Sequence, residues 1–259
     1  MHRLRRDINT SNCGSASFPR LMWTPRLHCC NAVLVLILVL MFSAAPISIA
    51  YAKDSASIEQ NLMEANGYYN KGNLDQALLL YRRCLEQDPN QSDCLCNLGS
   101  LLVDRGHTEE AETHYRRALE VTDSKHAGAL YNLALLLQDS QKEEDLMDAK
   151  NLYLKLINIE PDNAEAWANI GAVLHQLGDL NLAIRSYMKA IELYSIASDV
   201  TDNGSYLSLS SLYEKVGRAT LRLSERIAED SDTKSDLAAK AIGYLRKAVS
   251  YNPENEVRY

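Results

Sequence analysis

The chain has 259 residues, of which 46% are hydrophobic and 24% charged, and its formal net charge is −7. These values are ordinary for a globular protein and exclude a collagen-like, disulfide-dense or wholly disordered chain. Residues 1–52 hold five Arg against one acid, so the rest of the chain is more acidic than the whole. Because an acidic body repels phosphate backbones, nucleic-acid binding is not expected.

The apolar stretch near the N-terminus concerns targeting. Residues 1–28 form a basic polar leader, and 29–52 read as a signal peptide or a signal-anchor helix. The small residues of Ala50-Tyr51-Ala52 favour cleavage, whereas the long leader favours a retained anchor, which would hold the chain at a membrane. The Arg excess predicts a lumenal or extracellular body. A mitochondrial or plastid presequence, and a cytosol-facing body on an anchor, remain alternatives.

The cysteines indicate neither a disulfide framework nor a metal site. At this density a disulfide framework is not predicted. Cys94 and Cys96 have no second pair at zinc-ligand spacing, so no metal or cofactor is expected. The chain also has no Gly-rich phosphate loop after a strand and no nucleophile elbow, and we predict that it is not an enzyme.

The remaining chain is repetitive, with four alanines spaced by 34, 38 and 34 residues. A tyrosine follows each alanine after four residues, and a further small residue lies upstream of each alanine. Small residues at a crossing let two helices approach closely, and an aromatic ring fills the space beside the crossing. Gly72, Gly106 and Gly178 fall midway, where a helix can end in a left-handed turn. Each repeat is therefore predicted to be a helical hairpin that buries its apolar side against the next. The residues expected to pack at these crossings are Ala77, Tyr81, Gly99, Ala111, Tyr115, Ala149, Tyr153, Trp167, Gly171, Ala183 and Tyr187.

Four units cover the repetitive region, and a fifth is degenerate. The units span 58–91, 92–126, 127–163 and 164–197. In the third unit, the extra residues 141–148 are interpreted as a longer loop between its two helices. The degenerate hairpin covers 206–255, with a first helix over 206–227 and a polar loop over 228–235. Because Tyr259 falls where another unit would begin, we expect the chain to continue, or to be truncated, after 259.

The stretch from Ala164 to Gly171, with Trp167, followed by Ala183 and Tyr187, resembles the tetratricopeptide repeat (TPR) family. The resemblance implies an all-α, right-handed solenoid of antiparallel helix pairs. In this family the first helices line a concave groove that commonly receives an extended peptide.

Three asparagines recur at the sixth position of their units and are predicted to form a ladder along this groove: Asn97, Asn132 and Asn169. The ladder is similar to that of the O-linked N-acetylglucosamine transferase superhelix, and its amides could pair with a peptide backbone. Alternatively, they satisfy local helix groups. The other groove residues are Asp93, Asp104, Asp139, Glu165 and Tyr131.

Two functions remain open on the sequence alone. In the first, the chain is a non-catalytic, membrane-targeted scaffold that binds a basic or neutral peptide segment of a protein partner. In the second, it is the substrate-recruiting arm of a longer glycosyltransferase, whose catalytic domain lies outside this chain. The repeats fit both functions, since the fold does not fix the process.

Overall fold

A computed structural model describes residues 56–140, 142–197, 203–227 and 231–252, and all regular structure in these ranges is helical. The chain divides into two compact units, 1–53 and 54–259, and the description here concerns the second. The leader and the apolar segment 29–52 lie outside the described residues. None of the helices in the described ranges combines the length and the apolar character needed to cross a membrane.

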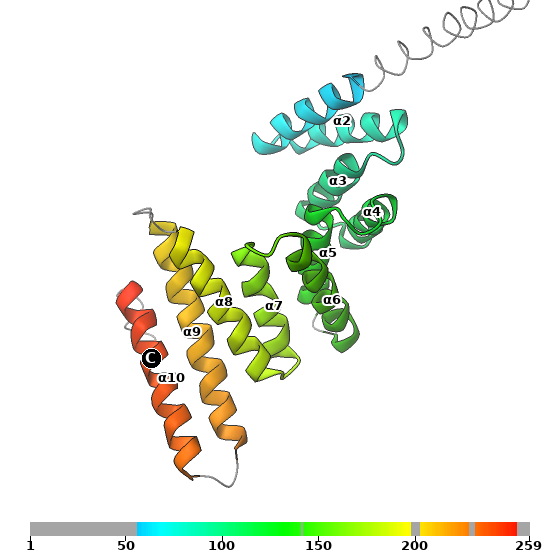
Figure 1. Ribbon diagram of the computed structural model, residues 1–259. Helices are drawn as coiled ribbons and strands as arrows, with labels where there is room; N and C mark the ends of the chain where they lie inside the picture. The colour runs from blue at the N-terminus through cyan, green and yellow to red at the C-terminus, as the bar shows by residue number, and fades with distance from the viewer. Residues whose placement is uncertain (1–55, 141, 198–202, 228–230, 253–259) are drawn as a thin grey trace, which may run out of the picture. The chain divides into compact units, whose positions relative to one another are not determined.

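The helices follow one another as antiparallel neighbours (Figure 1). A first helix over 56–70 precedes α2 (Leu74–Gln87). Besides its neighbours in the chain, α5 contacts both α3 and α7. The first helices of successive hairpins therefore stack on one another, which is the arrangement of a solenoid. The remaining helices are α3 (Ser92–Asp104), α4 (Thr108–Val121), α5 (Ala127–Asp139), α6 (Glu143–Ile159), α7 (Ala164–Gln176), α8 (Leu180–Ala197), α9 (Asn203–Arg226) and α10 (Ser231–Tyr251).

The repeated small and aromatic residues form the core of each hairpin. The four alanines that set the repeat are fully buried, and their tyrosines are nearly so. The turns at Gly72, Gly106 and Gly178 have φ values of 74°, 80° and 84°, a conformation in which a side chain is strained. The helices α3, α5 and α7 begin at side-chain caps from Gln91, His126 and Asn163. Local signals thus set where each helix ends, and the alanines and tyrosines set how the helices cross.

The third hairpin corrects one expectation, because its extra residues do not form a longer loop. Residues 143–148 are helical and lengthen α6 at its N-terminus. Glu143, Glu144 and Asp145 lie in the first turn, where carboxylates stabilise the positive end of the helix dipole. Leu146 is buried in the core, so the extension contributes to the packing.

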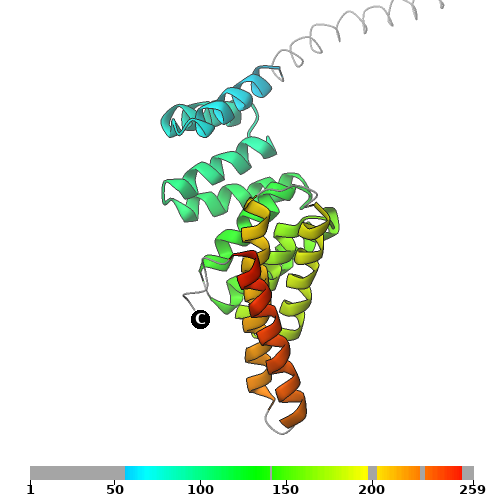
Figure 2. The ribbon, with the colours of Figure 1, turned by 90° about the vertical axis from the view of Figure 1, so that its left-hand side faces the viewer.

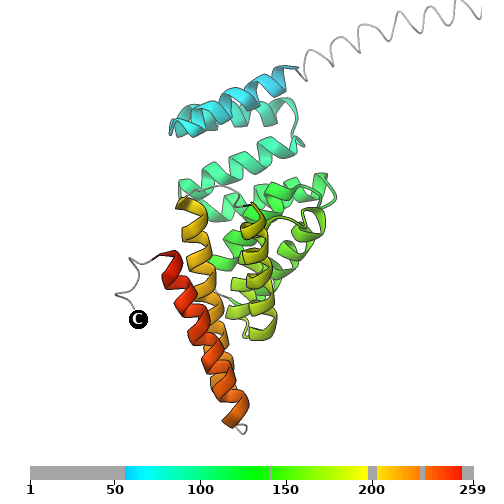
Figure 3. The ribbon, with the colours of Figure 1, turned by 60° about the vertical axis from the view of Figure 1, so that its left-hand side comes forward.

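The fifth hairpin consists of two long helices that lie side by side (Figures 2 and 3). The polar loop expected over 228–235 is shorter, because α10 already begins at Ser231. The Tyr213 ring stacks on that of Tyr251 with 5.6 Å between centroids, and the Ser210 hydroxyl donates to the Ala248 carbonyl at 2.8 Å. These contacts join α9 to α10 in the fifth hairpin, where the regular spacing of small residues and tyrosines seen in the first four units is lost.

The structure pairs Cys84 with Cys94 in a disulfide, although the sequence predicts no disulfide framework. Cys84 lies on α2 and Cys94 on α3, and their Cα atoms are 6.5 Å apart. The bond joins the first hairpin to the second. The number of cysteines could not predict it, because the pairing depends on how the two hairpins pack against each other. Cys96 is a free buried thiol two residues further on.

Candidate peptide-binding groove

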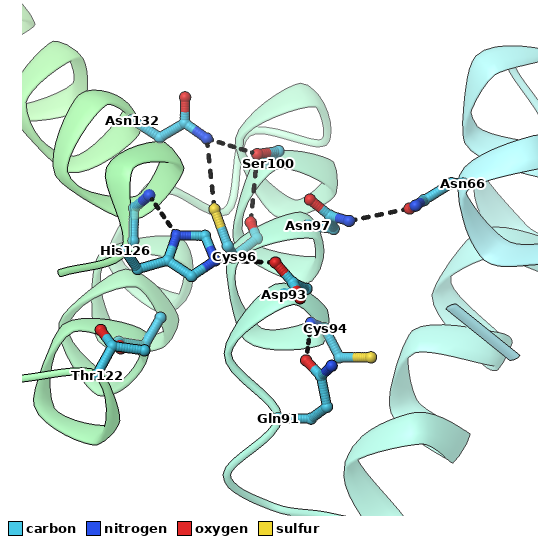
Figure 4. Close-up of polar contacts among 12 residues, drawn as sticks. Asn66, Gln91, Asp93, Cys94, Cys96, Asn97, Ser100, Thr122, His126 and Asn132 are labelled. Atoms are coloured by element: carbon cyan, nitrogen blue, oxygen red, sulfur yellow. Dashed lines mark hydrogen bonds and ion pairs between the residues drawn. The ribbon is translucent and has the colours of Figure 1, made fainter. Parts of the chain in front are cut away.

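The three ladder asparagines lie on α3, α5 and α7, and each reaches back to the preceding repeat. The Asn97 Nδ2 donates to Asn66 Oδ1 at 2.9 Å, and the Asn132 Nδ2 donates to the Ser100 hydroxyl at 3.1 Å (Figure 4). The Asn169 Nδ2 donates to the Tyr131 hydroxyl at 3.2 Å. One amide hydrogen of each residue therefore holds neighbouring repeats together, a role close to the structural alternative considered for the ladder.

The rest of each amide stays available. An asparagine side chain has two N–H donors and one acceptor oxygen. The inter-repeat bond of Asn97 and of Asn169 uses one donor, whereas the Asn132 Nδ2 donates both to Ser100 and, at 3.7 Å, to Cys96 Sγ. Among the described residues, none donates a hydrogen bond to the Oδ1 atoms of Asn97, Asn132 or Asn169. The ladder can thus join the repeats and still offer an oxygen and an N–H to a ligand.

Three of the four predicted groove acids also pair with a side chain on or beside another helix. The Tyr69 hydroxyl donates to Asp104 Oδ2 at 2.5 Å, and the Tyr131 hydroxyl donates to Glu165 Oε1 at 2.6 Å. Asp93 Oδ1 lies 3.1 Å from His126 Nε2, while His126 Nδ1 accepts from the Ala129 amide (Figure 4). Asp139 is exposed and has no hydrogen-bond or ion-pair partner among the described residues.

The tyrosine partners leave the carboxylate charge in place. Burial, followed by the hydrogen bond to Asp104, raises the pKa of Tyr69. Burial and the hydrogen bond to Glu165 raise the pKa of Tyr131 to about 12. Both phenols therefore donate in their neutral form near neutral pH. Asp104 and Glu165 are held in position without being neutralised.

The surface beside the ladder is hollowed in two adjoining places. One hollow, of about 370 Å³, is lined by residues that include Asn66, Tyr69 and Asn97. The next, of about 280 Å³, is lined by residues that include Asp104, Asn132 and Asp139. Tyr69 and Ser100 line both hollows, which therefore adjoin one another along the first three repeats. A third hollow of about 270 Å³ lies beside Tyr131 and Glu165.

The acidic character does not extend to the far end of this surface. The Arg226 Nη1 donates to the Gly178 carbonyl at 2.8 Å, at the turn after α7. His175 Nε2 is buried without a hydrogen-bond partner among the described groups, and burial, with the charges of Arg222 and Arg226, lowers the pKa of His175. The repeat positions of the first four units could not predict this basic end of the surface, because both arginines come from α9.

The predicted packing residues lie at the helix crossings, and the rings of Tyr81 and Tyr115 also line the hollows beside the ladder. A Cβ built on Gly99 would come within 2.7 Å of Tyr115, so this glycine sits against the ring of the second helix of its hairpin. The Trp167 Nε1 donates to the Pro161 carbonyl at 2.9 Å, outside the row of asparagines.

Stacked antiparallel helix pairs, with small residues and tyrosines at the crossings, define a TPR solenoid protein. The family model described as the middle TPR-like domain of cilia and flagella-associated protein 70 matches residues 62–218, more than half of the chain. The chain belongs to this family.

Relatives and solved structures agree with this assignment. The human protein O-mannosyl-transferase TMTC1 is 32% identical over 160 residues, which cover 49% of this chain but only 18% of the transferase. A crystal structure of MamA protein matches 79% of this chain and 96% of its own, with a TM-score of 0.58 and 20% identity. The crystal structure of YrrB, described as a TPR protein with an unusual peptide-binding site, has a TM-score of 0.58 and 19% identity, and the match covers 78% of this chain and 93% of YrrB. At these identities the structural matches show the fold alone.

Proposed function

We propose that this protein is a non-catalytic scaffold whose groove binds an extended basic or neutral segment of a protein partner. TPR proteins typically mediate protein–protein interactions, so the proposal concerns which segment is bound and where. One observation supports it most directly: the two adjoining hollows at Tyr69 and Ser100 lie beside free amide oxygens and exposed acids.

Backbone recognition would come from the ladder. An extended peptide has unpaired backbone N–H and C=O groups that must be satisfied when it leaves water. The oxygens of Asn97 and Asn132 can accept from the peptide N–H groups, and the second amide hydrogen of Asn97 can donate to a peptide carbonyl. Such pairing depends little on the peptide sequence.

Selectivity would come from charge. Asp104 and Asp139 line one hollow, while the tyrosine that bonds Asp104 is neutral, so a Lys or Arg side chain is favoured there and an acidic one disfavoured. These charges act partly through solvent, so binding should weaken as salt is added.

Fluorescence anisotropy of the full chain with labelled Lys-containing and Glu-containing peptides of otherwise equal sequence tests the proposal. We expect tighter binding of the Lys peptide, and Asp139→Lys should weaken it. Asn97→Ala with Asn132→Ala should weaken all peptides alike, whereas Asn151→Ala, at an exposed site on α6, should not change binding. Because the ladder also joins repeats, affinities are compared well below the thermal midpoints of all variants. Tighter binding of the Glu peptide would exclude this groove as the site.

We also propose that the body of the protein lies in a lumenal or extracellular space. Disulfides persist in oxidising compartments, and Cys84–Cys94 supports this location independently of the leader. Translation with microsomes, followed by glycosidase, tests glycosylation at the acceptor sites Asn90 and Asn203. Protection from protease with a glycosidase-sensitive shift is expected. Protection inside isolated mitochondria instead would support the presequence alternative.

The recruiting-arm alternative is favoured by a different observation, the 32% identity to an O-mannosyl-transferase. In that case the groove would present a protein substrate to a catalytic domain on the same polypeptide. Sequencing the transcript across the codon for Tyr259 tests this alternative. A reading frame that continues into a glycosyltransferase domain would support it, and a stop codon would leave the scaffold function.

A further inference from the structure

A hollow on the second half of the repeats is apolar and separate from the peptide groove. It has a volume of about 570 Å³ and lies on α6, α7 and α8. Leu154 and Leu182 are 42% and 49% exposed there, although leucines are usually buried. The apolar side chains that line it are Leu154, Ile157, Trp167, Ile170, Leu174 and Leu182.

This hollow faces away from the asparagine ladder. Trp167, Ile170 and Leu174 are three and four residues apart, so they share one face of α7. At about 100° per residue, Asn169 points to another face of the same helix. The walls are the second helices of two successive hairpins, α6 and α8, whereas the ladder lies on first helices only.

The rim of the hollow is mainly basic. Lys150 comes from α6, and Arg185 and Lys189 come from α8, against a single acid, Asp179. Lys189 pairs with Glu192 at 3.0 Å, but Lys150 and Arg185 form no ion pair with any acid in the described ranges. The surface thus joins an apolar floor to unpaired positive charge, opposite in sign to the peptide groove.

The lining also restricts the shape of the ligand. The lining comes mainly from three helices, whose interior backbone groups are already paired, and the Ser186 hydroxyl donates to the Leu182 carbonyl at 3.0 Å. An extended peptide would find almost no partners here for its backbone, at a cost of about 1–3 kcal/mol for each buried unpaired group. A helix pairs its own backbone and can place apolar side chains in the hollow.

From this combination we propose that the hollow between α6 and α8 is a second protein-binding site, which takes an amphipathic helix with acidic flanks. On α6, the lining residues run from Lys150 to Ile157, a length of about 10 Å or two helical turns. Two turns of a partner helix would place leucine-like residues over Leu154 and Leu182, and Asp or Glu beside Lys150 and Arg185. The site does not depend on the peptide groove.

The test uses the full chain and a labelled amphipathic peptide of about 16 residues, with a leucine row flanked by Glu. Matched peptides replace the flanking Glu by Lys or place Pro at the centre, and dodecanoate serves as a competitor. We expect the Glu-flanked helix to bind tightest. Leu154→Ser with Leu182→Ser should weaken it about tenfold or more, and Arg185→Glu should favour the Lys-flanked peptide.

The matched control is Leu79→Ser, at a leucine on α2 that is 62% exposed and does not line the hollow. This variant should bind like the unmodified protein. The Arg185→Glu variant changes only surface charge, so it remains informative if the double serine variant is unstable. Three results would each overturn the assignment. They are binding of the Pro-containing peptide as tight as that of the Glu-flanked helix, displacement of the bound helix by dodecanoate, and unchanged affinity in variants that are folded.

Discussion

Gly171 lies directly against the ring of Tyr187, at the crossing of α7 and α8. A Cβ atom on Gly171 would be 2.7 Å from Tyr187 Cδ1, closer than real Cβ contacts allow. Tyr187 is 2% exposed, so the ring has little room to move away. The first and third hairpins have Ala65 and Ala134 at the matching position, whereas the second has Gly99, which makes the same close contact.

Gly171→Ala is therefore expected to destabilise the protein by about 1–3 kcal/mol, because the added methyl group strains a close-packed crossing. Gly67→Ala is the matched control: this glycine is also within a helix, but nothing lies within 4 Å of its added Cβ. The control should stabilise the protein by about 0.5–1 kcal/mol, since alanine favours helix. Urea unfolding of both variants measures these changes, and changes of equal sign would contradict the packing described.

Reduction should destabilise the junction between the first two hairpins. The Cys84–Cys94 bond restricts the unfolded chain, which typically stabilises a protein by about 2–4 kcal/mol. Thermal melts with and without reductant should differ for the unmodified protein, but not for Cys84→Ser with Cys94→Ser. Finding both thiols free in non-reducing peptide mass spectrometry of the purified protein would contradict the pairing.

Stability should depend on pH through His175. Burial, with Arg222 and Arg226, lowers the pKa of His175 in the folded state, so the unfolded chain takes up its proton at a higher pH. The free energy of unfolding should thus fall as the pH drops below about 6.5. His175→Gln should reduce the difference between melts at about pH 7.5 and about pH 5.5. His114, whose pKa burial also lowers, should account for part of the remainder.

Asn151→Ala, at an exposed site on α6, provides the control for this measurement, because neither side chain titrates. Asn151→Ala should leave the pH dependence of the thermal midpoint unchanged. The same loss of pH dependence in both variants would show that the environment of His175 is not the cause.

The bond between Tyr69 and Asp104 should couple the first two repeats. Tyr69→Phe removes a hydrogen bond from a half-buried phenol to an exposed carboxylate, and we expect a loss of about 1 kcal/mol. A double-mutant cycle with Asp104→Asn separates this pair from other effects of each change. Purely additive losses would show that the two side chains do not interact in solution.

Much of the fold could be predicted because its signals are local and periodic. Ala77 and Tyr81 are four residues apart, so they lie on one face of one helix wherever that helix packs. Gly72 and Gly106 mark turns because few other residues adopt a positive φ. The loop expected over 141–148 was wrong because acidic residues suit a loop and a first helical turn equally well.

The sequence by itself determined the helical hairpins, their repeat and their membership of the TPR fold, because each hairpin is specified by contacts at fixed short spacings. Only the tertiary structure decided which side chains meet between repeats, since this depends on how one hairpin is rotated against the next. The pairing of Cys84 with Cys94, the bond from Asn97 to Asn66 and the apolar hollow beside Trp167 all depend on that rotation. No spacing within a single repeat specifies it.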